Sequence, residues 1–181
     1  EEVHEALKLF DFNKIPDKNN VEADVVVGQR GFKSNLTNQT GRIDLNTPTW
    51  EYRDGRLNAN TLDCPHGVFS DGKRLYIADT GNNRVLIFNK IPDKNNIAAD
   101  IVIGQKNFES DIYKIDIRRS IYKVNVNINI EANTLFSPKG VFSDGKRLFI
   151  ADTGCHRILI YNNIPTKNYI GADIVIGQKN F

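Results

Sequence analysis

The chain has 181 residues, of which 40% are hydrophobic, and its formal net charge is +2 at pH 7. This length predicts one domain, and the near-neutral charge gives no overall attraction to nucleic acid or to anionic membranes. No apolar run approaches the roughly 20 residues of a membrane-spanning helix, and no segment resembles a signal peptide. Two cysteines are too few for a disulfide scaffold, so the sequence leaves compartment and redox state undefined.

One stretch of the sequence occurs twice as an internal repeat. Residues 65–108 recur as residues 138–181, at an offset of 73 residues and with ten substitutions in 44 positions. A third, partial copy lies near the start, where residues 12–32 match residues 88–108 at an offset of 76. Self-similarity at a fixed period predicts stacked copies of one supersecondary unit.

Each complete unit divides at turn residues into four short apolar runs. In the first copy these runs are residues 67–69, 75–78, 85–88 and 99–103. Asp71 and Gly72 supply the positive φ of a tight hairpin between the first two runs. Pro92 has no backbone N–H to donate, so the third strand cannot extend its ladder of hydrogen bonds through this residue. Runs of this length joined by short turns predict an antiparallel meander.

The four runs are continuously apolar rather than alternating, which predicts a sheet covered on both faces. An isolated four-stranded sheet cannot be covered in this way, so copies of the unit must cover one another. We therefore predict an all-β fold, a β-propeller of four-stranded antiparallel blades. The chain would hold two complete blades and half of another, whose two outer strands would be residues 7–10 and 25–27.

Two stretches also resemble a known family. GVFSDGKRLYIADTGNNRVLIF (residues 67–88) and PKGVFSDGKRLFIADTGCHRILIY (residues 138–161) resemble NHL repeats. The continuation through IPDKNNIAADIVIGQKNF is similar to bacterial NHL-repeat proteins, which carry an insert between the terminal GQxxF and the next P-x-G. The resemblance covers about two-thirds of the chain and implies the propeller fold, but one fold hosts many functions.

These patterns predict one propeller region over residues 1–181. It consists of a partial blade at 1–32, an insert at 33–64, a blade at 65–108, a second insert at 109–137 and a second blade at 138–181. Because propellers usually have at least about four blades, we expect a fragment of a larger propeller, with self-association of several chains that completes the ring as the alternative.

An aspartate and an arginine flank the turn between the second and third strands of each blade. Such a pair can bond bidentately across the turn and hold it. Its recurrence in each blade favours a structural role over ligand binding. The predicted turn pairs are Asp79 with Arg84 and Asp152 with Arg157.

Cysteine and histidine collect on the edge of the blades where these turns lie. Zinc prefers such side chains, and the candidate ligands are Cys64, His66, Cys155 and His156, of which the last two replace Asn82 and Asn83 of the first copy. Pro65-His66-Gly67 also resembles the zinc-ligand segment of the propeller lyase that makes amidated peptides. That lyase takes a histidine from each of three blades, whereas the matching position here is Lys139.

The competing interpretation of these residues is ordinary variation at loop tips. Side chains on two different blades lie far apart at the rim, whereas bonds to one zinc ion are only about 2.0 to 2.3 Å long. Zinc is therefore a minor hypothesis, and no other cofactor is predicted.

Basic residues recur on the opposite edge of the blades, and acidic residues are interleaved with them. A phosphate-binding surface would cluster basic side chains with few acids among them. The pattern therefore favours solvated turns over nucleic-acid binding. The basic residues are Lys18, Lys73, Arg74, Lys94, Lys146, Arg147 and Lys167, and the interleaved acidic residues are Asp17, Asp71, Asp93 and Asp144.

No Ser-His-Asp order, P-loop, dinucleotide fingerprint or HExxH segment is present, so no catalytic residue is assigned. The leading hypothesis is a non-enzymatic binding module that contacts a protein, peptide or glycan through its inserts, because near-identical blades contrast with divergent inserts. Aromatic side chains favour interface anchors, although they could equally cap their own blades. The candidate contact residues are Trp50, Tyr52, Tyr113 and Tyr122, with His66 and Lys139 nearest the axis.

Two alternatives stay open at this point. One is a metal-assisted lyase or hydrolase with its site at the mouth of the central channel, near His66 and Lys139. The other is a purely architectural repeat within a larger protein. Metal content separates the first alternative from the rest.

Overall fold

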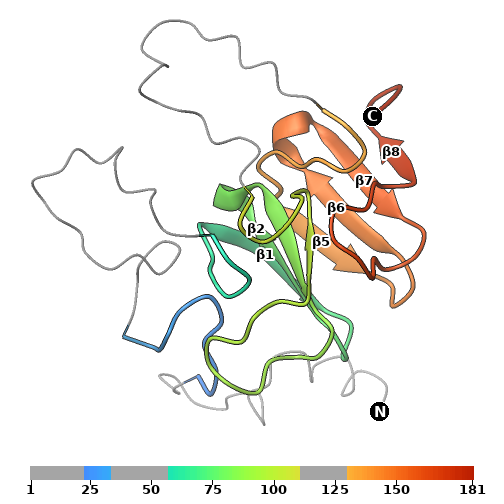
Figure 1. Cartoon of the computed structure of the whole chain (residues 1–181). Coiled ribbons are helices and arrows are strands. Elements are labelled where there is room, and N and C mark those ends of the chain that lie inside the picture. Colours follow the sequence, from blue (N-terminus) through green and yellow to red (C-terminus); the bar gives the residue numbers. More distant parts are fainter. Residues whose placement is uncertain (1–22, 34–56, 111–129) are drawn as a thin grey trace, which may run out of the picture.

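The computed structural model describes residues 23–33, 57–110 and 130–181, and these residues form two four-stranded antiparallel sheets (Figure 1). The first sheet runs in the order β1 (Pro65–Ser70), β2 (Leu75–Asp79), β3 (Arg84–Phe88) and β4 (Ile101–Ile103). The second runs in the order β5 (Gly140–Ser143), β6 (Leu148–Asp152), β7 (Arg157–Tyr161) and β8 (Ile174–Ile176). The all-β class and the four-stranded antiparallel blades are thus confirmed.

The helical content of the described ranges is limited to short 3₁₀ turns. These are η2 (Thr80–Asn82) between β2 and β3, and η4 (Thr153–Cys155) between β6 and β7. Neither they nor any other helix in these ranges has the length and apolar character needed to cross a membrane.

Aspartate and glycine close the hairpins between the first two strands of each blade. Gly72 and Gly145 have φ values of +83° and +88°, a conformation that residues with a Cβ rarely adopt. The Oδ1 atom of Asp71 accepts hydrogen bonds from the backbone N–H groups of Lys73 (3.0 Å) and Arg74 (2.7 Å). Asp144 holds the second hairpin in the same way, so local side-chain bonding fixes the register of both.

The fourth strands are shorter than the predicted run of residues 99–103. The N–H of Ala99 donates to the carbonyl oxygen of Ala59 (2.7 Å), and the N–H of Ala172 donates to that of Ala132 (2.8 Å). Both residues therefore bond the chain that leads into their own blade instead of extending the ladder. Each blade is tied to its preceding segment at this point.

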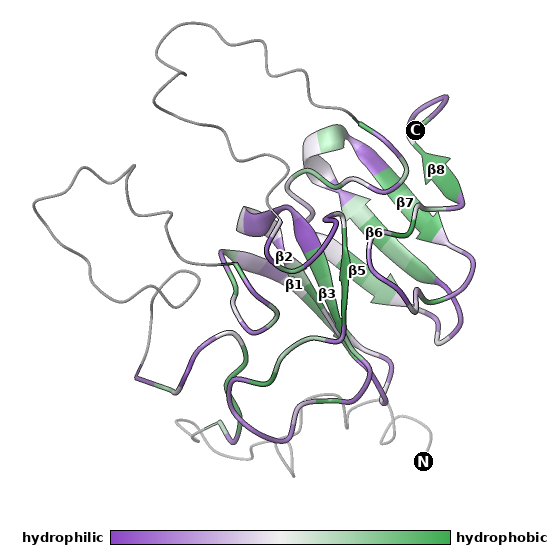
Figure 2. Ribbon diagram, viewed as in Figure 1, coloured by the Kyte–Doolittle hydropathy of each residue, from purple (hydrophilic) through white to green (hydrophobic). Residues whose placement is uncertain are grey.

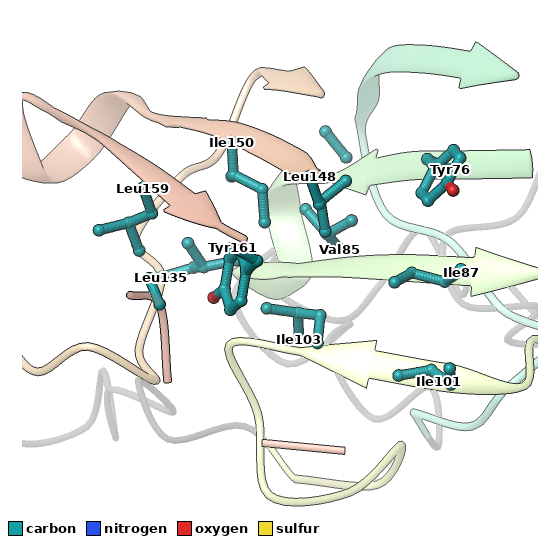
Figure 3. Packing of buried hydrophobic residues seen from close by; sticks show 12 residues of the cluster. Tyr76, Val85, Ile87, Ile101, Ile103, Leu135, Leu148, Ile150, Leu159 and Tyr161 are labelled. Carbon is teal, nitrogen blue, oxygen red and sulfur yellow. The ribbon is translucent and has the colours of Figure 1, made fainter. Parts of the chain in front are cut away.

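The two blades cover one another through their faces. Tyr76, Val85, Ile87 and other side chains of the first blade share one buried cluster with Leu148, Ile150, Leu159 and Tyr161 of the second (Figure 3). The inner strands β1 and β5 lie side by side, and a Cβ at Gly67 would collide with the carbonyl oxygen of Lys139. The prediction that copies of the unit stack on one another is confirmed for these two blades.

The other face of the first blade is covered in part by residues 23–33. Val27 packs against the cluster formed by Ile77, Leu86, Phe88 and neighbouring side chains. Residues 25–27 were expected to be the outer strand of a preceding half blade, yet the structure assigns no strand there. Their predicted ladder partner, residues 7–10, lies outside the described residues.

Hydrogen bonds lower the pKa of the hairpin aspartates. Backbone and side-chain bonds from Arg147, with a further backbone bond from Lys146, lower the pKa of Asp144 to about 2. At Asp71 partial burial raises the pKa, but bonds from Arg74, Tyr76 and Lys73 outweigh it and bring it below the usual value. The ionised form of both carboxylates therefore stabilises the folded chain.

We predict that D71N and D144N each flatten the acid limb of the stability curve. A depressed pKa in the folded state contributes stability that is present above the unfolded value near pH 3.8 and is lost as the pH falls through the folded value, which is about 2 for Asp144. Asparagine keeps the acceptor oxygen that the turn needs but does not titrate. Melting temperatures measured from pH 6 to pH 2 test this, and curves for variant and wild type that stay parallel would contradict it.

Candidate functional site at the top edge of the blades

The chain leading into each first strand and the turn between the second and third strands meet at one edge, here called the top edge. The N–H of Gly81 in η2 donates to the carbonyl oxygen of Asp63 (2.9 Å). In the second blade the N–H of Gly154 donates to that of Phe136 (2.8 Å). Residues 58–63 and 131–136, which lie at the ends of the two predicted inserts, are called the entry stems.

A buried ion pair organises the top edge of the first blade. Nε of Arg84 lies 2.7 Å from Oδ2 of Asp79, and neither side chain is exposed to solvent. Oδ1 of the same carboxylate accepts from the N–H of Asp63 (2.7 Å), and Oδ2 accepts from Nδ2 of Asn82 (2.8 Å). Because every contact is charge-assisted, the pair fixes both the turn and the entry stem.

The guanidinium of Arg84 also binds the backbone on either side of the blade. Nη2 donates to the carbonyl oxygens of Thr61 (2.8 Å) and Asn58 (3.1 Å) in the entry stem. Nη1 donates to the carbonyl oxygen of Phe108 (2.7 Å), where the blade ends and the second insert begins. One buried arginine therefore holds the end of one insert and the start of the next.

The second blade repeats this arrangement except at Nη1 of Arg157, which is buried without a hydrogen-bond partner. Nε of Arg157 lies 2.8 Å from Oδ2 of Asp152, and Oδ1 of Asp152 accepts from the N–H of Phe136 (2.7 Å). Nη2 of Arg157 donates to the carbonyl oxygens of Glu131 (2.9 Å) and Thr134 (3.0 Å). The second insert thus begins at the arginine of one blade and ends at the arginine of the next.

Burial and pairing act in opposite directions on the first carboxylate. Desolvation raises the pKa of Asp79, while the positive charge of Arg84 acts to lower it. A carboxylate that is out of contact with water and already accepts three hydrogen bonds is not accessible to a ligand. The pair is therefore a structural anchor.

The turn in which Cys155 and His156 replace two asparagines keeps its backbone shape. Asn83 and His156 have φ values of 53° and 54°, in the left-handed region. Burial raises the pKa of the Cys155 thiol to about 11, and the Asp152 carboxylate contributes in the same direction. Cys155 therefore stays protonated at neutral pH and hydrogen-bonds the carboxylate, as Asn82 does in the first blade.

The four candidate zinc ligands are not gathered around one point. Cys155 is buried in its own turn, whereas Cys64, His66 and His156 are exposed. The ring nitrogen Nδ1 of His66 lies 3.0 Å from the carbonyl oxygen of Cys64. Within the described parts of the chain, no group of three or more His, Cys, Asp or Glu residues is placed to hold a metal ion.

His66 and Lys139 lie at the starts of neighbouring inner strands. Both side chains are exposed, and the N–H of Lys139 donates to the carbonyl oxygen of Ala151 (3.1 Å). They therefore line the same edge as the entry stems. The four candidate aromatic residues Trp50, Tyr52, Tyr113 and Tyr122 lie outside the described residues.

The basic residues of the opposite edge pair with their own hairpin aspartates. Nη1 of Arg74 lies 3.3 Å from Oδ2 of Asp71, and Nε of Arg147 lies 2.8 Å from Oδ2 of Asp144. These ion pairs reduce the charge available to a phosphate backbone.

The residues of the entry stems were missed in the reading of the sequence. In the second stem Oγ1 of Thr134 accepts from the N–H of Glu131 (2.9 Å), and Thr61 caps the first stem in the same way by bonding Asn58. The signal was available, because Ala-Asn-Thr-Leu occurs at residues 59–62 and again at 132–135, with the same offset as the blades. The repeat therefore starts before Pro65.

Four-stranded antiparallel blades, stacked face to face with an aspartate–arginine anchor in each, define a repeat protein of the β-propeller type. Residues 62–88, from the end of the first entry stem through β3, match the family model of the NHL repeat. These residues therefore carry an NHL repeat. A search of curated proteins finds no match to it.

We predict that R84M lowers the free energy of unfolding by about 3 to 5 kcal/mol, because it leaves the Asp79 carboxylate buried without a counter-charge. The matched control is K90M. Lys90 and Asp93 also lie 2.7 Å apart, but their side chains are 80% and 61% exposed. Loss of an exposed pair costs little stability, because solvent screens its charges. Urea unfolding measures both, and similar losses for the two variants would contradict the anchoring role.

We predict that one cysteine reacts with a thiol reagent at pH 8 in the folded protein and two react after unfolding. Cys64 is exposed, whereas Cys155 is buried and its pKa is raised to about 11. Reactivity follows thiolate character and access. Counting labelled sites by mass spectrometry, with C64S as the control, tests this. Rapid labelling of Cys155 in folded C64S would contradict the geometry of the turn.

Proposed function

We propose that the chain is a non-enzymatic NHL-repeat binding module that contacts a protein, peptide or glycan through the inserts on its top edge. The observation that carries the proposal is the arginine anchor. Arg84 binds the entry stem at the end of the first insert and the start of the second insert, and Arg157 binds the entry stem at the end of the second. Both inserts are therefore presented from fixed points on one edge.

Such anchoring suits recognition for a physical reason. A binding segment whose ends are held by a rigid framework loses less conformational entropy when it meets its partner. The blades repeat with ten substitutions in 44 positions because they must stack on one another, whereas the inserts are under no such constraint. Binding residues are often found on loops that a rigid scaffold positions.

The side chains proposed to make contact are chosen by type and by place. Trp50, Tyr52, Tyr113 and Tyr122 are large, amphipathic residues within the two inserts, and such residues are enriched at the energetic centres of interfaces. His66 and Lys139 are exposed at the starts of the inner strands and complete the proposed surface.

The charged residues on the opposite edge of the blades bear on the kind of partner. The arginines of the opposite edge are paired with aspartates of their own turns, which disfavours a nucleic acid as partner. NHL repeats commonly mediate protein interactions, and this supports a protein or peptide as partner before a glycan.

We predict that the W50A/Y52A double variant loses its partner while keeping the stability of the wild type. The measurement is affinity capture with the full chain from a cell extract and on a panel of immobilised glycans, with thermal melting of each variant in parallel. If these aromatics instead cap their own blade, the melting temperature falls in step with binding.

The matched control is the K146A/R147A variant on the opposite edge. It should retain every partner that the wild type captures, because it leaves the inserts and their anchors unchanged. A partner that is lost in K146A/R147A but kept in W50A/Y52A would contradict binding through the top edge. So would a wild-type chain that captures nothing above a bead control.

A further inference from the structure

The turn between β2 and β3 of the first blade bonds the chain at three ends of the inserts. This turn, residues 79–84, is called the hub turn. Figure 2 shows hydrophilic residues here, at the end of strands that are largely hydrophobic. Asp79, Thr80, Asn82 and Arg84 are nevertheless buried. Buried polar groups that bond one another form a network whose members depend on each other.

The first two insert ends meet at one arginine of the hub turn. Nη2 of Arg84 donates to the carbonyl oxygen of Thr61 (2.8 Å) at the end of the first insert, and Nη1 donates to that of Phe108 (2.7 Å) at the start of the second. Because one planar guanidinium makes both bonds, the two insert ends are adjacent. The N–H of Glu109, in the same peptide group as the Phe108 carbonyl, donates to Oδ1 of Asn107 (3.0 Å). This peptide group is therefore held at both of its polar atoms.

The hub turn also holds the third insert end, where the second insert enters β5. Oδ1 of Asn83 accepts from the N–H of Ser137 (2.8 Å), and Oγ1 of Thr80 donates to the carbonyl oxygen of Pro138. Ser137 has a φ of 51°. This left-handed conformation costs energy for a residue with a Cβ and persists where surrounding contacts hold it. The second insert therefore both begins and ends on the hub turn.

The equivalent turn of the second blade, residues 152–157, bonds the end of the second insert. Oδ1 of Asp152 accepts from the N–H of Phe136 (2.7 Å), and Nη2 of Arg157 binds the same entry stem. Thr153 and His156 occupy the positions of Thr80 and Asn83 in this turn, and both are exposed. The contacts that join one insert to the other are thus made by the hub turn of the first blade.

We infer that the hub turn couples the two inserts, so that they act as one binding surface. This inference rests on the proposed function of the inserts. Loosening the end of the first insert removes bonding partners from Asp79 and Arg84, and this weakens the bonds by which the same turn holds the second insert. A partner that orders one insert likewise lowers the entropy cost of ordering the other. The partner therefore contacts both inserts at once, which suits a protein surface.

The first test loosens the end of the first insert and measures the two ends of the second. T61V removes a hydroxyl that bonds both the N–H and the carbonyl oxygen of Asn58 (3.2 Å each). Hydrogen exchange in the full chain, measured by NMR, should speed up at the N–H groups of Glu109 and Ser137. The expected change is at least about threefold, as for residues that share a hydrogen-bond network. Each rate is taken relative to an amide in the centre of β2, which reports the opening of the whole blade.

The matched control for T61V is S70A. It also removes a hydroxyl of the first blade that accepts from a backbone N–H, that of Gly72 (3.1 Å), but at the opposite edge. The relative exchange rates of Glu109 and Ser137 should stay within about twofold of the wild type, as expected for a site that shares no partner with them.

The second test works in the reverse direction. Asn83 has a φ of 53°, which glycine adopts without strain, so N83G keeps the turn and removes the oxygen that binds Ser137. Exchange at the N–H of Asp63, in the first entry stem, should speed up by at least about threefold relative to β2. The control H156G makes the same change at a φ of 54° with an exposed side chain, and it should leave Asp63 as in the wild type.

A third measurement asks whether one partner touches both inserts. A protein that the wild type captures should be lost by W50A/Y52A in the first insert and equally by Y113A/Y122A in the second. A partner that is lost by one double variant and fully retained by the other would contradict a single surface.

The exchange tests separate this inference from the proposed function. Acceleration confined to the perturbed insert in T61V or N83G overturns the coupling even where a partner is captured, and so does equal acceleration in S70A or H156G. Coupled exchange in a chain that captures no partner overturns the binding function and leaves the coupling in place. Circular dichroism of each variant verifies that the blades remain folded, and T80V, which removes the bond to Pro138, replaces N83G if that variant unfolds.

Discussion

The top edge of each blade depends on one buried interaction, the ion pair between an aspartate at the end of the second strand and an arginine at the start of the third. Neither side chain of the Asp79–Arg84 pair is exposed to solvent. A buried charge pair is tolerated only when its remaining donors and acceptors are satisfied. In the first blade the Asn82 side chain, backbone groups of the entry stem and the carbonyl oxygen of Phe108 meet that requirement, so the cost of burial is offset by fixing segments that would otherwise be free to move. In the second blade, Nη1 of Arg157 is buried without a hydrogen-bond partner.

The pair and the stacking of the blades depend on each other. The apolar faces exclude water from the region in which the ion pair lies, and the ion pair holds the entry stem whose leucine packs on the preceding blade. Leu135 belongs to the cluster shared by the two blades, and it directly follows Thr134, which Arg157 binds. Disturbing either contribution should therefore weaken the other.

Much of the fold could be predicted from the sequence, because repeats and turn residues are local signals. The Asp-Gly hairpins, the four runs and the stacking all follow from them. The fourth strands were predicted too long, since nothing local reveals that Ala99 and Ala172 bond the stems. The zinc hypothesis came from residue types on one edge. It lacked the packing information that buries Cys155 beneath its own turn while its proposed partners remain exposed.

The most direct test of this account is hydrogen exchange at the N–H groups of Asp63 and Phe136, measured by NMR. Both lie in the entry stems outside any strand, and each donates to a buried carboxylate at 2.7 Å. If the ion pairs anchor the stems, these amides exchange as slowly as those in the centres of β2 and β6. Exchange at the rate of an exposed loop would show that the stems open independently of the blades and would contradict the account.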